Sequence, residues 1–122
     1  MSLEPVQKAA WIYLFTTQPN PPSSNPELAL QRKVCYAIAA EIEALVTGIY
    51  IDAGYPGLGE ERTGLSLLLD HLTQPHHRVT HLIVLRSDLL AKAEPMALKL
   101  KKQIAQSDIR LVTADPPQYS YT

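Results

Sequence analysis

Polar side chains follow three apolar runs of this chain, at the points where strands are expected to end. Thr16 and Thr17 come after the first run, Asp52 after the second, and Ser87 and Asp88 after the third. In an open parallel sheet the carboxyl ends of the strands meet at one edge, and ligands bind there. Hydroxyl groups and carboxylates gathered at such an edge could carry out group transfer, or could bind a metal ion or a small molecule.

The elements that would position these residues follow from the apolar pattern. Ala9 to Thr16 is a short β-forming run and predicts a buried first strand. Asn25-Pro26-Glu27 has the form of a helix start, and helical spacing continues to about residue 46, with Gly48 as the end of that helix. The pattern also predicts strands at 49–51, 81–85 and 109–112, helices at 65–72 and from Pro95, and a short turn at 87–91.

This alternation of strands and helices predicts an α/β fold with three layers. A mainly parallel sheet would lie between helices on both of its faces. At 122 residues the chain is expected to form a single domain over residues 1–122, with irregular tails at 1–8 and 116–122.

The composition is typical of a globular domain, with 46% hydrophobic residues, 19% charged residues and a net charge of −1. DNA-binding modules are usually basic, so this balance argues against strong phosphate binding by this segment alone. Cys35 is the single cysteine, which excludes an internal disulfide and favours a reducing, cytoplasmic location. No apolar run reaches membrane-spanning length, and we expect no membrane contact.

The sequence predicts neither a metal ion nor a cofactor. The histidines at positions 71, 76, 77 and 81 lack a second cluster at the spacing of zinc ligands, and Cys35 is distant from them in sequence. The glycines at positions 54, 57 and 59 are not followed by the Gly-Lys-Ser/Thr ending of a phosphate-binding loop.

Three segments occur in an order that resembles one known family. The first is Tyr13-Leu14-Phe15-Thr16-Thr17, the second is Asp52 with Arg62-Thr63-Gly64-Leu65 after a loop, and the third is Asp88-Leu89-Leu90-Ala91-Lys92. They are similar to the strand Tyr-x-Arg-Val-Ser, the strand-ending Asp with an Arg-x-Gly-Leu helix, and the segment Asp-Arg-Leu-x-Arg of the serine recombinases (resolvases and invertases). The resemblance covers residues 9–115.

This resemblance implies a resolvase-like, flavodoxin-like topology and DNA as a partner, with a homodimer as the expected assembly. The implied reaction is cleavage and rejoining of DNA strands through a phosphate ester on Thr17. Arg62 and Lys92 would bind the phosphate, and Asp52 and Asp88 would orient these two cations.

The chain departs from the family at residues that would do this chemistry. Two arginine positions are apolar here, Phe15 and Leu89, and Lys92 replaces a third arginine. Arginine forks stabilise the charge that develops on phosphate oxygens, and lysine lacks this planar fork. Losing one preorganised donor costs about 10²–10³ in rate, so two lost arginines would remove roughly 10⁴ or more. We therefore expect an impaired or inactive domain that associates with itself or with DNA-bound partners.

Alternatives remain open at this point. Asp52 could simply cap the loop that follows it, and Arg62 could form a structural salt bridge to Asp52 or Asp88. The competing function is a small α/β binding or signalling domain with Asp52 and Asp88 as a carboxylate rim. The recombinase family continues into a long helix, which Pro116-Pro117 would interrupt, so we expect either a piece of a longer protein or a short relative.

Overall fold

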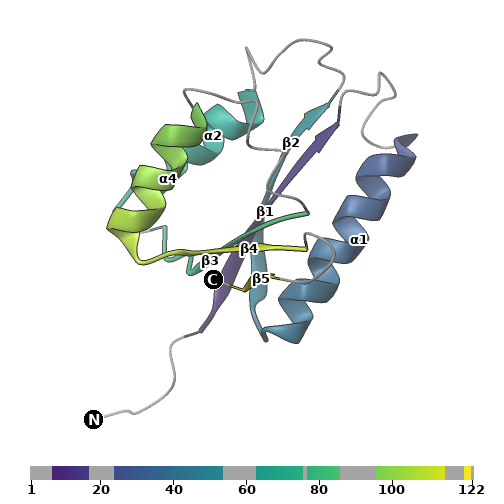
Figure 1. Ribbon diagram of the computed structural model, residues 1–122, viewed down its shortest axis with the longest axis horizontal. Helices are drawn as coiled ribbons and strands as arrows, with labels where there is room; N and C mark the ends of the chain where they lie inside the picture. The colour runs from purple at the N-terminus through teal and green to yellow at the C-terminus, as the bar shows by residue number, and fades with distance from the viewer. Residues whose placement is uncertain are drawn as a thin grey trace.

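A mainly parallel sheet lies between α1 on one side and α2 and α4 on the other in the computed structural model (Figure 1). The structure describes residues 7–16, 24–53, 63–75, 77–85, 96–114 and 120–121. The elements in chain order are β1 (Ala9–Thr16), α1 (Pro26–Glu41), β2 (Leu45–Ala53), α2 (Thr63–Leu72), β3 (His81–Val84), α4 (Met96–Ser107), β4 (Arg110–Thr113) and β5 (Ser120–Tyr121).

The strand order of the sheet is β2-β1-β3-β4-β5. β1 pairs in parallel with both β2 and β3, and β3 pairs in parallel with β4, whereas β5 runs antiparallel to β4. The order 2-1-3-4 is that of flavodoxin-like sheets, in which the winding reverses between β1 and β3. The predicted three-layer α/β fold with a mainly parallel sheet is therefore confirmed.

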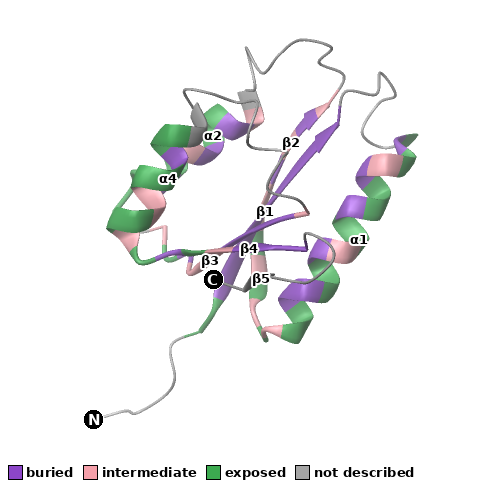
Figure 2. Cartoon of the chain, in the orientation of Figure 1, coloured by how far each residue is buried: buried purple, intermediate pink, exposed green. Residues whose placement is uncertain are grey.

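β1 is buried along all of its eight residues, as Figure 2 shows. A central parallel strand is covered on both faces, which explains why its sequence is a continuous apolar run. Alternate side chains of β1 contribute to two cores. The core on the α1 side contains Ala10, Ile12 and Leu14, and the core on the side of α2 and α4 contains Trp11, Tyr13 and Phe15.

β2 begins earlier than the sequence predicted. α1 ends at Glu41, and Glu43 has a positive φ of 61°, so the helix does not continue to residue 46. Leu45 and Val46 instead pair with the first two residues of β1. Their apolar side chains fit either a helix or a strand, and pairing with the buried β1 decides between the two.

Gly48 was predicted to end a helix and instead lies inside β2, opposite Trp11. A Cβ atom at this position would be 2.9 Å from Cδ1 of Trp11, so the indole packs directly against the glycine backbone. Glycine is therefore found here because the Trp11 ring and the β2 backbone approach each other closely.

The prediction of an irregular C-terminal tail is wrong for Ser120 and Tyr121. These two residues pair with Thr113 and Val112 at the outer side of β4. The backbone groups at that side of β4 need hydrogen-bond partners, and a short antiparallel strand supplies them. At the other tail, the described residues Gln7 and Lys8 have no regular structure.

The other predicted elements agree closely with the structure. Asn25 caps α1 through hydrogen bonds from the backbone N–H groups of Glu27 and Leu28, as its sequence predicted. The predicted second helix is α2, and β3 and β4 differ from their predicted ranges by one residue. The turn predicted at 87–91 lies outside the described residues. None of the described helices has the length and apolar character needed to span a membrane.

The single cysteine, Cys35, is fully buried in the core beneath α1. Burial raises the pKa of its thiol to about 12. A thiol of this kind behaves as a small core side chain and is not a reactive group.

Candidate active-site edge

Asp52 lies near the C-terminal end of β2 with its carboxylate turned toward α2, and it is 1% exposed. Its Oδ1 accepts a hydrogen bond from the backbone N–H of Gly64 at 2.7 Å, and its Oδ2 accepts one from that of Leu65 at 2.9 Å. The Tyr13 hydroxyl donates to Oδ2 at 2.7 Å. One buried carboxylate therefore joins β1, β2 and the start of α2.

These contacts make Asp52 the cap of α2, although it precedes the helix by a whole loop. The first N–H groups of a helix have no partner inside the helix, and a nearby carboxylate also complements the positive end of the helix dipole. The helix start approaches β2 very closely: a Cβ on Gly64 would be 2.5 Å from the carbonyl oxygen of Ile51. Asp52 therefore fixes where α2 begins, which is the point that follows Arg62 in sequence.

Phe15 places its ring in the core on the α2 side and is 8% exposed. Its backbone is held by the side chain of Gln31 from α1. The Gln31 carboxamide donates to the Phe15 carbonyl at 2.7 Å and accepts from the Phe15 N–H at 3.2 Å. The pairing of β1 with β3 ends at Tyr13, so Gln31 takes the place of a neighbouring strand beyond that point.

Thr16, the last residue of β1, is 1% exposed. Its hydroxyl donates a hydrogen bond to the carboxylate of Glu27, in the first turn of α1. The side chains of Thr16 and Asp52 therefore bond to different helices, on opposite sides of the sheet.

Asp52 is the one residue of the predicted catalytic set whose placement the structure describes. Thr17, Arg62, Asp88 and Lys92 lie outside the described residues, as does Leu89. Their joint arrangement at the edge of the sheet stays a prediction. The described residues next to Thr17 and Arg62 belong to β1 and α2, so this strand and this helix lead to the edge.

Two of the described histidines, His71 and His77, have their rings close to Trp11. His71 is near the C-terminal end of α2, and its Nδ1 is 2.7 Å from the Tyr50 hydroxyl. Burial raises the pKa of Tyr50, so the phenol keeps its proton. His77 accepts a hydrogen bond from the Val79 N–H at 3.0 Å. Within the described ranges no three His, Cys, Asp or Glu side chains are grouped as metal ligands would be.

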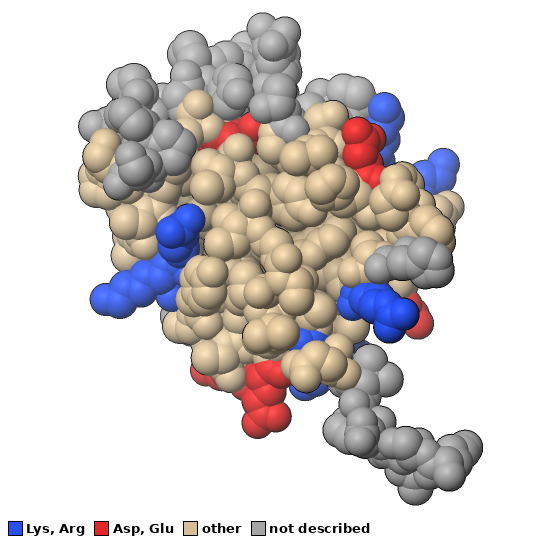
Figure 3. Space-filling model, turned by 180° about the vertical axis from the view of Figure 1, so that it is seen from behind, with Lys and Arg blue, Asp and Glu red and all other residues tan. Residues whose placement is uncertain are grey.

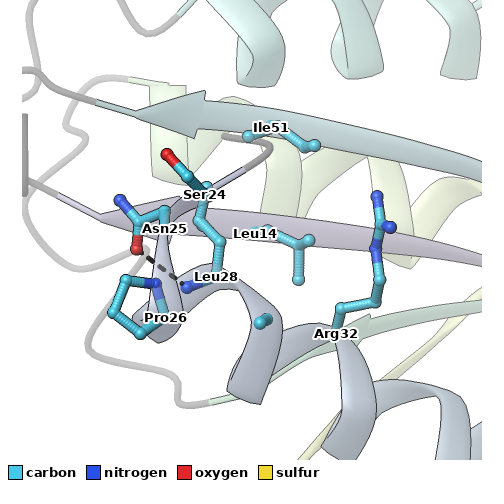
Figure 4. Close-up of a pocket in the computed structure, with 8 residues that line it drawn as sticks. Leu14, Ser24, Asn25, Pro26, Leu28, Arg32 and Ile51 are labelled. Atoms are coloured by element: carbon cyan, nitrogen blue, oxygen red, sulfur yellow. Dashed lines mark hydrogen bonds between the residues drawn. The ribbon is translucent and has the colours of Figure 1, made fainter. Parts of the chain in front are cut away.

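A hollow of about 760 Å³ lies between α1 and β2, on the face of the sheet opposite Asp52. Leu14, Leu28 and Ile51 supply its apolar walls. Figure 4 shows the Arg32 side chain extending from α1 toward β2, and Asn25 bonded to the Leu28 N–H at the start of the helix. The hollow therefore lies on the other face of the sheet from the Asp52 carboxylate.

Gln31 is the residue at this site that sequence reasoning missed. It occupies the apolar stripe of α1, between Leu28 and Cys35, and is 1% exposed. A polar side chain at a buried helical position needs a partner. The break in the apolar stripe was a signal that α1 satisfies a polar group of the sheet.

The strand order, the capped α2 and the polar residues beyond β1 and β2 define a doubly wound α/β domain with a strand-end site. A family model described as "Resolvase, N terminal domain" matches residues 18–122, and the chain belongs to this family. The predicted resemblance to the serine recombinase catalytic domain is thus confirmed. The match begins after β1, so it does not test the alignment of Phe15 and Thr17.

Solved structures show the same fold. The crystal structure of the N-terminal catalytic domain of TP901-1 integrase is similar to this chain with a TM-score of 0.68 and 19% sequence identity. The similarity covers 88% of this chain and 78% of that one. Among curated proteins, none matches the sequence.

Replacing Gln31 with leucine is expected to lower the free energy of unfolding by about 2–3 kcal/mol. Leucine fills the space but removes both hydrogen bonds between Gln31 and the Phe15 backbone, and each hydrogen bond lost at a buried site costs about 1 kcal/mol or more. Chemical denaturation checks this, with Gln106→Leu on the exposed side of α4 as the control. That control should change stability by about 0.5 kcal/mol at most. A Gln31→Leu protein as stable as the control would contradict this role.

Proposed function

We propose that this domain has the serine recombinase architecture but cleaves DNA poorly or not at all, and that it acts by associating with DNA or with protein partners. The observation that carries the proposal is the burial of Phe15. By the resemblance, this position would hold a phosphate-binding arginine, and here it holds an apolar ring that packs in the core.

The physical argument concerns charge at the reacting phosphate. Nucleophilic attack on a phosphodiester increases negative charge on its non-bridging oxygens, and preorganised cations lower the barrier. A buried phenyl ring provides no such cation. The two hydrogen bonds with the Gln31 side chain also hold the backbone of Phe15 in place. With Leu89 also apolar, Arg62 and Lys92 are the remaining cations of the family pattern. One of these two is a lysine, which makes a weaker phosphate clamp.

The residual reaction, if it occurs, follows the family pattern. The Thr17 hydroxyl would give up its proton as its oxygen forms a bond to phosphorus and the bond to one bridging DNA oxygen breaks, and return of a proton to that oxygen would release it as a DNA hydroxyl. Asp52 would act as a positioning residue, because its hydrogen bonds to the first turn of α2 fix the helix start, which follows Arg62 in the sequence.

The competing function is a metal-binding or small-molecule rim made by Asp52 and Asp88. Asp52 already accepts hydrogen bonds on both of its carboxylate oxygens and is almost fully buried. A metal ion would have to displace the cap of α2 to reach them. This observation favours the recombinase-type edge over the carboxylate rim.

The test is a search for a covalent protein–DNA adduct on nicked duplex oligonucleotides of randomised sequence, which trap a cleaved intermediate. We expect no adduct above background with the unaltered chain, and we expect retention of the DNA or of a second protein in a binding assay. The controls are Thr17→Ala and Thr73→Ala, the second being an exposed threonine far from the edge. An abundant adduct that disappears in Thr17→Ala and persists in Thr73→Ala would contradict the proposed loss of activity.

A further inference from the structure

The hollow between α1 and β2 exists because the helix covers the two neighbouring strands unequally. The β1 side chains that face α1, such as Leu14, are almost completely buried. The β2 side chains on the same face, such as Ile51, are only half-buried. β2 is the last of the described strands on this side of the sheet, and α1 packs mainly over the strands farther in. Part of the apolar surface of β2 is therefore left open beside the helix.

The hollow has the size and the walls of a small-molecule site. Its volume of about 760 Å³ lies within the range of roughly 300–1,000 Å³ that is typical of ligand pockets. Leu14, Leu28 and Ile51 form apolar walls, and Ser24 and Asn25 lie at the end where α1 begins. Walls of this kind hold the apolar body of a ligand, and a polar or charged side chain then fixes its orientation.

Arg32 is the charged residue among the described side chains that line the hollow. It extends from α1 toward β2 (Figure 4). Within the described ranges, no group forms a hydrogen bond or an ion pair with its guanidinium. Glu27, the acidic residue in the first turn of the same helix, is bonded to Thr16 instead. The hollow therefore carries a positive charge that no described carboxylate pairs with.

These features favour an organic anion with an apolar body. A guanidinium binds a carboxylate through two parallel hydrogen bonds, and the apolar walls take up the rest of such a ligand. DNA fits less well, because a phosphate backbone is bound by several cations along its length. In Figure 1, β4 passes in front of β1, so Figure 3 shows the β2 side of the molecule. The charged side chains on that side lie around its centre and form no row across it.

We propose that the hollow between α1 and β2 binds a small organic carboxylate. The apolar body of the ligand contacts Leu14, Leu28 and Ile51, and its carboxylate binds the guanidinium of Arg32. The site lies on the other face of the sheet from the Asp52 carboxylate, and none of the predicted catalytic residues lines it. The inference therefore does not depend on whether the domain cleaves DNA.

The experiment uses octanoate as the probe, because it joins one carboxylate to an apolar chain. Methyl NMR spectra are recorded while octanoate is added to millimolar concentration. We expect saturable shifts at the methyl groups of Leu14, Leu28 and Ile51. The methyl groups of Leu68, in the core on the other face of the sheet, serve as the internal reference and should shift much less.

Arg32→Gln tests the charge. It should weaken octanoate binding by about five-fold, the size expected for a partly exposed ion pair of good geometry. The affinity for 1-octanol, which has the same chain length and no charge, should not change. Lys33→Gln is the matched control, since it removes the same charge at the next, exposed position of α1, which does not line the hollow. It should leave octanoate binding as it is in the unaltered chain.

Three results would overturn the proposal. The first is the absence of saturable shifts at the methyl groups of the hollow, or shifts of the same size at Leu68. The second is an equal loss of octanoate affinity in Arg32→Gln and Lys33→Gln, which would indicate a general effect of net charge. The third is an equal loss of octanoate and 1-octanol affinity in Arg32→Gln, which would mean that the guanidinium does not bind the carboxylate.

Discussion

Replacing Asp52 with alanine should lower the free energy of unfolding by about 3 kcal/mol or more, which is a large fraction of the total for a small domain. The change removes an acceptor that takes hydrogen bonds from Tyr13, Gly64 and Leu65. Hydrogen bonds to charged groups contribute about 1.5–3 kcal/mol each, and loss of a helix cap alone costs about 0.5–2 kcal/mol. The buried Tyr13 hydroxyl also loses this partner.

Two measurements separate this role from a general loss of stability. Denaturant unfolding gives the change in free energy, and hydrogen exchange shows whether the amides of Gly64 and Leu65 open before the rest of α2. Asp70→Ala is the control, because Asp70 is exposed on the same helix, and it should change stability by about 0.5 kcal/mol at most. Equal effects of the two substitutions would mean that Asp52 does not cap α2.

Asp52→Asn tests the charge in particular. Asparagine keeps the size of the side chain, but one of its two terminal groups becomes a donor and cannot accept from a backbone N–H. We expect a free energy of unfolding between those of the wild-type and Asp52→Ala proteins. A protein as stable as wild type would show that shape, and not the accepting carboxylate, holds the start of the helix.

The strands and helices that local pattern determines could be predicted from the sequence. Ala9–Thr16 is apolar at almost every position because helices cover both faces of the sheet, and Asn25-Pro26 marks the first turn of α1 through its cap. The leucine spacing of α2 is equally direct, because one face of this helix packs against the sheet. The residues that predict these elements therefore lie within the elements themselves.

The elements that were mispredicted depend on partners distant in sequence. Leu45 and Val46 join β2 because β1 offers backbone groups to pair with, and Gly48 is required by the ring of Trp11. Ser120 and Tyr121 form a strand because β4 needs a neighbour. None of these causes is visible in a local window of sequence.

The candidate site could also be predicted from the sequence only in part. The position of Asp52 at a strand end could be predicted, but its partners could not, since they come from β1 and from a helix beyond a loop. Gln31 was passed over because it lies on an apolar helical stripe, where a polar residue has no obvious local role. Its role depends on β1 extending beyond its pairing with β3.

Gly64→Ala should be at least as damaging as the loss of Asp52, although alanine normally stabilises a helix by up to about 1 kcal/mol relative to glycine. The new Cβ would be 2.5 Å from the carbonyl oxygen and 2.9 Å from the carbonyl carbon of Ile51. These are backbone atoms of β2, which cannot move aside without disturbing the sheet. The helix start must therefore shift, and its hydrogen bonds to Asp52 lengthen or break.

Gly48→Ala provides a graded comparison for this prediction. Its Cβ would be 2.9 Å from Cδ1 of Trp11, which belongs to a side chain that can adjust by a few tenths of an ångström. Thermal denaturation should therefore rank the proteins as wild type, then Gly48→Ala, then Gly64→Ala in order of decreasing stability. If Gly64→Ala were instead stabilised, helix propensity would outweigh the contact, and α2 would not need its close approach to β2. If the expected ranking holds, the Gly64-Leu65 pair is explained by the need to dock a helix start on a strand end, whether or not the domain cleaves DNA.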